Sequence, residues 1–292
     1  SQPFSPKEFY CFVQRIQNQE VSTASTATQD VADAQFSGHI LLVEDNDINQ
    51  EVAAGLLEDL GVTFDIADDG IATLTMNRPY KRNAMCDDLL IAIDGFFSNP
   101  PKQVKAVVLT GTAGHFCSGL DLSEHVARDA EGTMRHSRGW HQVMERIQFG
   151  GLPVVSAMFG AVIGGGLELA TATHVRIAEP STIFQLPEGR RGIFVGGGAS
   201  VRVGRILGAD RMIEMMLTGR RYGADEGLAL GLAHYSVGEG EALDMAQDLA
   251  RKIAKNAPLS NYIMIQALSR IEDMAKADGL FTESLCAAMT QT

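Results

Sequence analysis

Cysteine is scarce in this chain of 292 residues, and the cysteines that occur lie far apart. Cys11, Cys86, Cys117 and Cys286 form no C-x-x-C pair and follow no regular disulfide spacing. A framework of disulfides is therefore not expected. The cysteine usage favours a reducing compartment, and we expect a cytoplasmic protein.

Long apolar runs are also missing. No stretch reaches the roughly 20 consecutive apolar residues that a membrane-spanning helix needs. Residues 1–20 lack a cationic start followed by an apolar run, which is the pattern of an export signal. We therefore expect no membrane partner and no export.

Positive charge is in short supply, with 24 Lys and Arg against 36 Asp and Glu, a formal net charge of −12. This balance repels nucleic acid at long range, so no nucleic-acid partner is predicted. In contrast, apolar residues make up 45% of the chain, enough to fill the core of one large α/β domain or two smaller ones.

Several catalytic patterns are absent from the sequence. The seven histidines form no H-E-x-x-H or other metal-ligand spacing, so we predict no metal. No G-x-S-x-G nucleophile motif occurs. Cys117 has no histidine at a fixed spacing, and a small buried core residue is the favoured interpretation for it.

Composition and pattern divide the chain into three regions. Residues 1–37 end in a polar stretch of small residues that is typical of a linker. Residues 38–66 read strand, helix, strand, and residues 67–292 alternate strands with helices. That alternation predicts a layered α/β domain built on crossover connections.

The stretch "ILLVEDNDINQEVAAGLLEDLG" resembles the first third of a response-regulator receiver domain. In that family an acidic pair, here Glu44 and Asp45, holds Mg²⁺ beside a phosphorylated aspartate. The resemblance ends near Gly70, and the strands that carry the phosphoacceptor, Thr/Ser and Lys of that family have no counterpart downstream. A structural fragment or fusion remnant is therefore favoured over a signalling role.

In the third region, strands are expected at "IATLTM", "VKAVVLTGT", "PVVSAMFG" and "VRIAEP", and helices at "CDDLLIAIDGFFSN" and near residues 165–173, 209–217 and 242–255. Gly164, Gly165 and Gly166 precede one of these helices. Free N–H groups and the positive end of the helix dipole at such a turn suit an anionic oxygen, although a simple tight turn would use the same glycines.

Two carboxylates stand near these glycines in the sequence. Glu168 lies in the first turn of the apolar helix, and Glu188 follows in "QLPEG" before a second glycine-rich turn. Together they make a candidate acid/base pair facing an oxyanion site. The alternatives are a solvated helix start for Glu168 and a capping acid for Glu188.

Four segments in order resemble the crotonase superfamily, the enoyl-CoA hydratase/isomerase fold. They are "NRPYKRNAM", "AVVLTGTAGHFCSGLDLSE", "GGGLELA" and "QLPEGRRGIFVGGGASVRV". The resemblance covers residues from about 70 to the C-terminus and implies a layered β-α superhelical fold preceded by the receiver-derived β-α-β extension. The strings "LPEGRRGIFVGGGASVRV" and "FCSGLDLSEH" look most like the methylthioacryloyl-CoA hydratase branch.

The resemblance also implies roles for individual residues. The backbone N–H groups of Leu120 and Gly165 would form the oxyanion hole for a thioester carbonyl. Glu168 and Glu188 match the two glutamates of the hydratases, and Gly196 would help to place the water. The isomerases of the family commonly keep only the acid that matches Glu188, so retention of both favours a hydratase acting on a short-chain enoyl-CoA. A double-bond isomerase and a catalytically silent fusion remain the alternatives.

Binding of the substrate is implied with less detail. Lys81 and Arg82 match a loop that passes the CoA nucleotide, where cations suit phosphates, although an ordinary solvated loop would look the same. Ser118, Asp121 and Leu122 fall where the family lines the CoA path. The substrate itself carries coenzyme A, so no separate cofactor is predicted. The family implies a homotrimer or a hexamer.

Three departures from the family pattern stand out. Val195 replaces the usual proline before Gly196. At the N-terminal seam, "VTFDIADDG" occupies the place of the family's first strand, so we predict that residues 62–67 pair with residues 71–76 through a turn at Asp69 and Gly70. Most relatives also continue into a further helical segment after "FTESLCAAMTQT".

Overall fold

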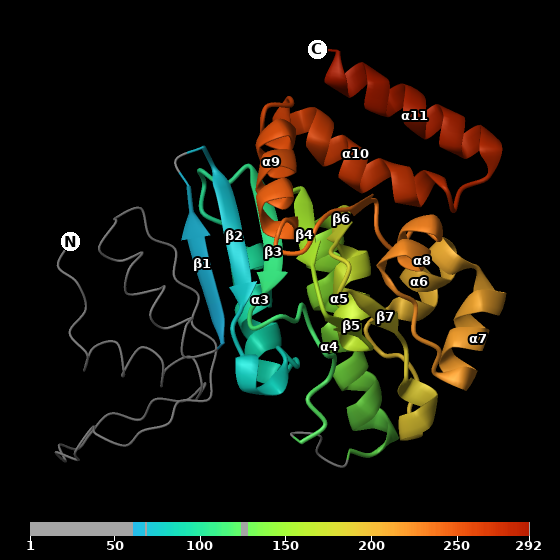
Figure 1. Cartoon of the computed structure of the whole chain (residues 1–292). Helices are drawn as coiled ribbons and strands as arrows, with labels where there is room; N and C mark the ends of the chain where they lie inside the picture. Colours follow the sequence, from blue (N-terminus) through green and yellow to red (C-terminus); the bar gives the residue numbers. More distant parts are fainter. Residues whose placement is uncertain (1–60, 68, 124–127, 292) are drawn as a thin grey trace, which may run out of the picture. The chain divides into compact units, whose positions relative to one another are not determined.

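The computed structural model describes residues 61–67, 69–123 and 128–291. The linker 1–37 and nearly all of the receiver-like segment 38–66 lie outside these ranges, so only the strand at 62–66 can be compared with prediction. The described part is an α/β fold in which helices cover both faces of a central sheet (Figure 1).

The central sheet has six strands in the order β1-β2-β3-β4-β6-β8. Its pairs are parallel except for the antiparallel pair of β1 and β2. The strands are β1 (Val62–Ile66), β2 (Ile71–Met76), β3 (Ala106–Gly111), β4 (Val154–Met158), β6 (Val175–Ala178) and β8 (Tyr235–Ser236). Every residue of β3 and β4 is buried, as the continuous apolar runs of these two central parallel strands predict.

The predicted hairpin at the N-terminal seam is confirmed. Val62 pairs with Met76 and Ile66 pairs with Ala72. Gly70 takes a positive φ of 82°, which glycine adopts without steric cost, and Asp69 Oδ1 accepts a hydrogen bond from the N–H of Ile71. The strand 62–66 therefore belongs to the sheet of the enzyme-like domain.

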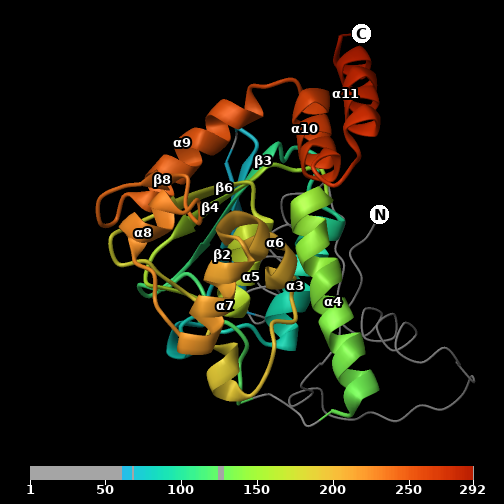
Figure 2. The ribbon, with the colours of Figure 1, turned by 90° about the vertical axis from the view of Figure 1, so that its right-hand side faces the viewer.

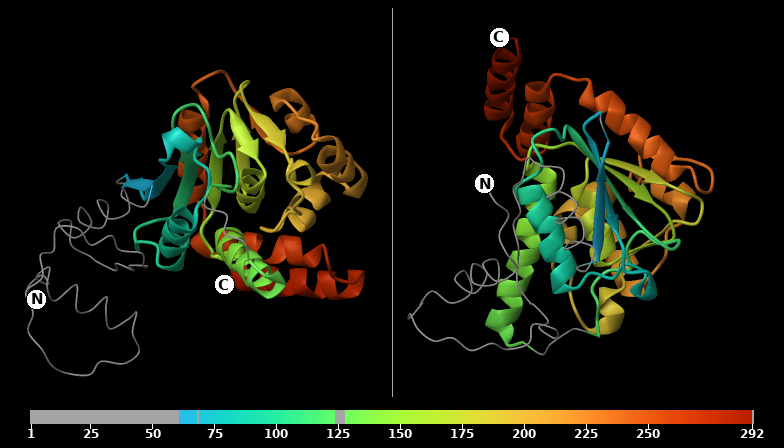
Figure 3. Two further views of the ribbon diagram at one scale, coloured as in Figure 1. Left: turned by 90° about the horizontal axis from the view of Figure 1, so that it is seen from below. Right: turned by 90° about the vertical axis from the view of Figure 1, so that its left-hand side faces the viewer.

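Helices pack on the two faces of the sheet in different ways. The helix α9 (Ala242–Ala254) covers one face and packs its alanines against β3, β4 and β6 (Figure 3, right). On the opposite face lie α3 (Asp87–Ser98), α4 (Ala130–Phe149) and α5 (Gly165–Ala172), whose apolar residues join one large core cluster (Figure 2). The expected helices at 165–173, 209–217 and 242–255 are present.

A second, two-stranded sheet pairs β5 (Ala161–Ile163) with β7 (Ile183–Gln185) in parallel. The helix α5, with Glu168, follows β5, and the short helix η3 (Glu188–Arg191), with Glu188, follows β7, so the two glutamate-bearing segments start from the same end of neighbouring strands. The remaining elements are the short helix η2 (Pro79–Lys81) and the helices α6 (Ala199–Leu207), α7 (Ala209–Thr218), α8 (Ala224–Ala229), α10 (Pro258–Ile271) and α11 (Lys276–Thr290).

The sequence analysis did not identify several of these elements. The longest element not predicted is the 20-residue helix α4. Most of its residues are polar, and only four are buried: Trp140, Val143, Met144 and Ile147. These residues follow helical spacing but all lie in the second half of the helix, and the first half is mostly polar, so the segment does not show an apolar face along its whole length. This helix matters for function because it contacts the site described below.

Candidate functional site

The first predicted backbone donor, Leu120, lies in a segment fixed by Met85. The N–H of Met85 donates to the carbonyl of Gly119 at 2.7 Å, and the N–H of Asp121 donates to the carbonyl of Met85 at 2.8 Å. The N–H of Leu120 between them has no acceptor among the described residues. It is therefore available to an oxygen atom of a ligand.

The second predicted donor, Gly165, is the first residue of α5, so its N–H has no acceptor within the helix. Gly119 brings the two donors together. A Cβ atom on Gly119 would lie 2.6 Å from the carbonyl oxygen of Ile163 and 3.1 Å from the nitrogen of Gly165. Only a glycine at position 119, with its φ of 92°, allows the two segments to approach so closely.

Glu168 sits one helical turn into α5 and is 3% exposed. Its Oε1 accepts hydrogen bonds from the N–H of Gly197 at 2.8 Å and from the N–H of Ala199 at 3.1 Å. Burial raises the pKa of this carboxyl group, while the two N–H donors and the charge of Arg202 oppose the rise. The carboxylate is thus held in one orientation by the turn that precedes α6.

Glu188 is the first residue of η3 and is 7% exposed. Its Oε2 is buried and has no partner among the described residues. Burial, together with the charge of Glu168, raises its pKa to about 7. The side chain lies against the start of α5, because a Cβ atom on Gly164 would be 2.9 Å from Glu188 Oε1.

The structure therefore brings Gly165, Glu168 and Glu188 together, with the two carboxyl groups close enough for their charges to interact. Their environments differ: Glu168 receives N–H donors, whereas Glu188 Oε2 receives none. Such a difference is how a protein assigns one carboxyl group to a basic role and another to an acidic role at the same pH.

Gly196 lies in the turn that holds Glu168. Its carbonyl accepts a 2.6 Å hydrogen bond from the hydroxyl of Ser137 on α4. Arg202 secures the same turn by donating from Nη1 to the carbonyl of Gly197 at 3.0 Å. Neither supporting role was predicted from the sequence: Ser137 lies outside the quoted motifs, and Arg202 lies within "QLPEGRRGIFVGGGASVRV" but acts through a backbone carbonyl that the motif does not reveal.

The residues predicted to bind CoA also gather in one place. Ser118 Oγ donates to the carbonyl of Lys81 at 3.0 Å, and the N–H of Ser118 donates to the carbonyl of Arg82. Leu122 is 45% exposed, and Arg82 is also exposed, so both are accessible to a ligand.

Asp121 has a different environment from its neighbours. Its carboxylate is 4% exposed and forms ion pairs with Arg78 at 3.1 Å and with Lys81 at 3.4 Å. Burial opposes ionisation, yet hydrogen bonds from Ser123 and the two cations lower the pKa of Asp121 to about 2. Asp121 therefore ties the loop at 78–82 to the segment that carries Leu120, and part of the charge of Lys81 is already neutralised within the protein.

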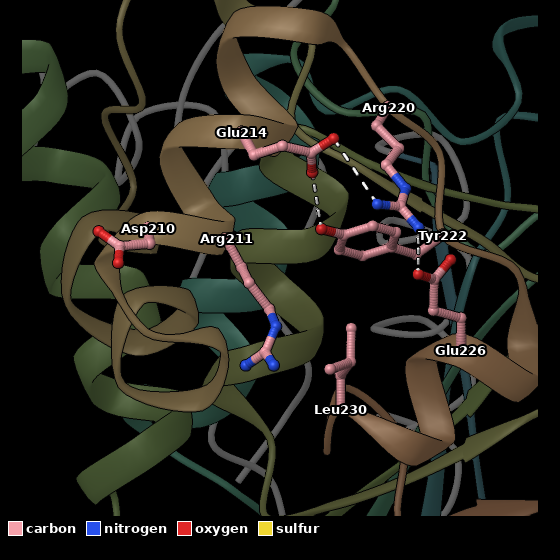
Figure 4. A pocket seen from close by; sticks show the side chains of 7 residues that line it. All are labelled: Asp210, Arg211, Glu214, Arg220, Tyr222, Glu226 and Leu230. Carbon is pink, nitrogen blue, oxygen red and sulfur yellow. Dashed lines mark hydrogen bonds and ion pairs between the residues drawn. The ribbon is translucent and has the colours of Figure 1, made fainter.

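A pocket of about 430 Å³ lies elsewhere, on α7, α8 and the segment between them (Figure 4). Four of its polar side chains bond to one another. Tyr222 donates to Glu214 at 2.9 Å, and Arg220 pairs with Glu226 at 2.5 Å and stacks over the Tyr222 ring at 4.7 Å. Arg220 also pairs with Glu214 at 3.7 Å, so it links a carboxylate of α7 to one of α8. Neither Glu168 nor Glu188 lines this pocket.

The fold places two backbone N–H groups without acceptors among the described residues near two buried carboxyl groups, an arrangement suited to stabilising an oxyanion and transferring protons. Comparison with known proteins shows the family. The model of the enoyl-CoA hydratase/isomerase family matches residues 67–291, so the chain belongs to the enoyl-CoA hydratase/isomerase family.

Individual relatives support this assignment. The chain is 33% identical over 228 residues to the bovine (Bos taurus) mitochondrial enoyl-CoA hydratase domain-containing protein 2, covering 75% of this chain and 76% of the relative. It is 32% identical over 204 residues to the short-chain-enoyl-CoA hydratase of Clostridium acetobutylicum, covering 68% of this chain and 78% of the relative. The chain is also similar to a crystal structure described as a putative enoyl-CoA hydratase from Rhodopseudomonas palustris. The two are 47% identical with a TM-score of 0.77, and the match covers 79% of this chain and 89% of that chain.

Within the ranges that the structure describes, no helix is both long enough and apolar enough to cross a membrane. The printed name of the bovine relative places that protein in mitochondria.

Proposed function

We propose that this protein is an enoyl-CoA hydratase that adds water across the α,β double bond of a short-chain enoyl-CoA. The observation that carries the proposal is the presence of both Glu168 and Glu188, buried on either side of the glycine turn that begins α5. The resemblance to a short-chain-enoyl-CoA hydratase at 32% identity supports the same reaction.

In the proposed reaction the thioester carbonyl oxygen accepts hydrogen bonds from the N–H groups of Leu120 and Gly165. Glu168, as a carboxylate, removes a proton from a water molecule held near Gly196 while the water oxygen bonds to Cβ. Electrons move from the double bond to the thioester oxygen, where the two N–H groups stabilise the resulting charge.

Glu188, as a carboxylic acid, then delivers its proton to Cα as the enolate returns to a thioester. The raised pKa of Glu188 supports this role, because a carboxyl group with a pKa of about 7 is largely protonated below neutral pH. Return of a proton from Glu168 to Glu188 through solvent restores the starting state. No other co-reactant is needed.

The CoA portion would lie along the segment 118–122 and the loop that contains Arg82. Exposed Arg82 is the better candidate for a phosphate contact, since Lys81 already pairs with Asp121 and Ser123. We also propose methylthioacryloyl-CoA as a substrate to compare with crotonyl-CoA, on the strength of the "LPEGRRGIFVGGGASVRV" segment.

We further propose that the chain forms a homotrimer or hexamer in the cytoplasm. Large apolar side chains of α10 and α11 are exposed in the single chain, and burial against another copy would remove them from water: Leu259, Tyr262, Met264, Leu268, Leu280, Phe281, Leu285 and Met289. Cys86, Cys117 and Cys286 are free thiols, which supports a reducing location.

The test is hydration of crotonyl-CoA and methylthioacryloyl-CoA, followed as loss of the ultraviolet absorbance of the enoyl thioester. We expect Glu168→Gln and Glu188→Gln each to lower kcat/KM by about 10²-fold or more. Glu283→Gln, an exposed change on α11, is the matched control and should leave the rate unchanged.

Two outcomes would favour the alternatives. If Glu168→Gln retains full activity and the wild type converts β,γ-unsaturated thioesters to α,β-unsaturated ones, the protein is an isomerase. If the folded wild type neither binds acyl-CoA nor turns it over, or if a phosphodonor modifies it, a catalytically silent or signalling fusion is supported instead.

A further inference from the structure

Trp140 is the one tryptophan of the chain, and α4 places it directly against the candidate site. A Cβ atom on Gly165 would lie 2.8 Å from Cζ3 and 3.0 Å from Cη2 of its ring. A Cβ atom on Gly197 would lie 3.0 Å from Cε3 of the same ring. One edge of a single indole ring therefore touches two glycines that belong to different elements.

These two glycines have different tasks in the site. Gly165 presents the N–H proposed for the oxyanion hole, and Gly197 donates its N–H to Glu168. The ring edge thus fills the space between the proposed position of the thioester oxygen and the turn that orients Glu168. An acyl chain that left the thioester carbon in the direction of that turn would meet the indole.

The ring is buried in this place. Trp140 is 6% exposed, and its indole N–H is buried with no acceptor among the described residues. An unpaired buried donor costs free energy, so a tryptophan is an expensive choice if the position only needs an apolar side chain for the core. The size of the indole is therefore the property that distinguishes this residue from a phenylalanine or leucine.

We propose that Trp140 is the end wall of the acyl pocket and the residue that restricts this enzyme to short acyl groups. Met85, whose Cε lies 2.8 Å from the same Cβ position on Gly165, fills the adjoining space with a flexible chain that can move aside. The rigid, planar Trp140 cannot do so without a change of rotamer. The inference rests on the proposed acyl-CoA substrate.

The first test uses activity. kcat/KM is measured for crotonyl-CoA and decenoyl-CoA with the wild type, Trp140→Phe and Trp140→Ala. We expect Trp140→Ala to raise the ratio of kcat/KM for decenoyl-CoA to kcat/KM for crotonyl-CoA by at least about 10-fold. The reason is that each methylene admitted to an apolar pocket adds binding energy. Trp140→Phe should give an intermediate ratio and keeps the variant series informative if the alanine variant folds poorly.

The matched control is Ile147→Ala, a buried residue two turns further along α4. It removes a similar kind of core contact, so it should lower the melting temperature without changing the chain-length ratio. A ratio within about twofold of the wild type in folded Trp140→Phe and Trp140→Ala would overturn the proposal.

The second test does not depend on turnover, and it separates this inference from the proposed hydratase activity. Because Trp140 is the only tryptophan, the tryptophan fluorescence of the protein reports on this ring alone. We expect the emission to change when butyryl-CoA binds and to stay unchanged with CoA that carries no acyl group. Calorimetry should also show that Trp140→Ala binds decanoyl-CoA relatively more tightly than the wild type does.

The outcomes can be told apart. Absence of hydration together with the fluorescence change would refute the reaction but support the acyl wall. Binding of butyryl-CoA by calorimetry with no change in tryptophan emission, and with no shift in chain preference, would refute the acyl wall whatever reaction the enzyme catalyses.

Discussion

The backbone N–H of Gly197, in the turn before α6, donates a 2.8 Å hydrogen bond to Oε1 of Glu168 on α5, 29 positions earlier in the chain. The glycine also leaves room for the carboxylate, since a Cβ atom at position 197 would lie 2.6 Å from Glu168 Oε2. The position of one proposed catalytic side chain therefore depends on the absence of another side chain.

This relationship predicts the effect of Gly197→Ala. The added methyl group would displace the carboxylate, and a misplacement on the order of 1 Å costs about 10²-fold in rate. We expect kcat/KM for crotonyl-CoA to fall by that factor. Gly139→Ala is the matched control, because Gly139 lies within α4 and a Cβ atom at this position meets nothing within 4 Å. It should keep full activity and stabilise the protein by about 0.5–1 kcal/mol. Equal losses in the two variants would contradict the prediction.

The raised pKa of Glu188 predicts how the hydration rate depends on pH. If the neutral acid donates the proton to Cα, the active form exists below a pKa of about 7. We therefore expect kcat/KM for hydration to fall as pH rises through about 7. Glu188→Gln should have a lower rate that no longer falls over this pH range. A pH–rate profile of initial rates in both proteins checks this. A rate that rises through the same range would assign the basic role to Glu188 instead.

The same pKa predicts an effect on stability. Below its usual pKa of 4.5, Glu188 is protonated in both the folded and the unfolded states, so it adds no pH dependence. Between 4.5 and about 7 the folded state binds more protons than the unfolded state, and the free energy of unfolding falls as pH rises. Glu188→Gln removes this loss, and we expect it to stabilise the protein at pH 8 by up to about 3 kcal/mol. Denaturant titrations of the wild type and Glu188→Gln at pH 5 and pH 8 measure the free energy of unfolding. If the difference between the two proteins is the same at both pH values, ionisation of the Glu188 carboxyl group is not the cause.

The ion pairs of Asp121 predict a contrasting behaviour. Asp121→Asn removes the negative charge beside buried Arg78 and should lower the free energy of unfolding by about 3 kcal/mol at pH 7. Since the folded pKa is depressed from 3.8 to about 2, the stability contributed by Asp121 is present above pH 4 and is lost as pH falls toward 2. The difference between variant and wild type should shrink over that range. Lys81→Met is the comparison and should cost less, because Lys81 is 37% exposed.

Much of the central fold follows from local patterns. The continuous apolar runs of β3 and β4 predict buried parallel strands, and the alternation from Val62 predicts the hairpin partner of β2. The helix α4 was not predicted, because its regularly spaced apolar residues are confined to its second half and its first half is mostly polar. Local periodicity indicates an element only when one face is clearly apolar.

Some residues of the candidate site can be recognised in the sequence, whereas others are revealed only by the structure. Gly165, Glu168 and Glu188 are visible in the sequence because glycines and acids interrupt apolar segments there. The partners of these residues are not visible. Ser137 and Trp140 lie outside the quoted segments, and Arg202 lies within one, but all three contact backbone or bare glycine in ways that no segment reveals. The ion pairs of Asp121 likewise join segments about 40 residues apart.

The sequence by itself determined the family pattern, the main parallel strands of the central sheet, and the presence of two glutamates near a glycine-rich helix start. Only the tertiary structure decided which N–H groups hold Glu168, why Glu188 keeps a proton near neutral pH, and which ring closes the space beside Gly165. The physical reason is that hydrogen bonding, burial and packing between distant segments depend on how the chain folds back on itself, and no local window of residues contains them.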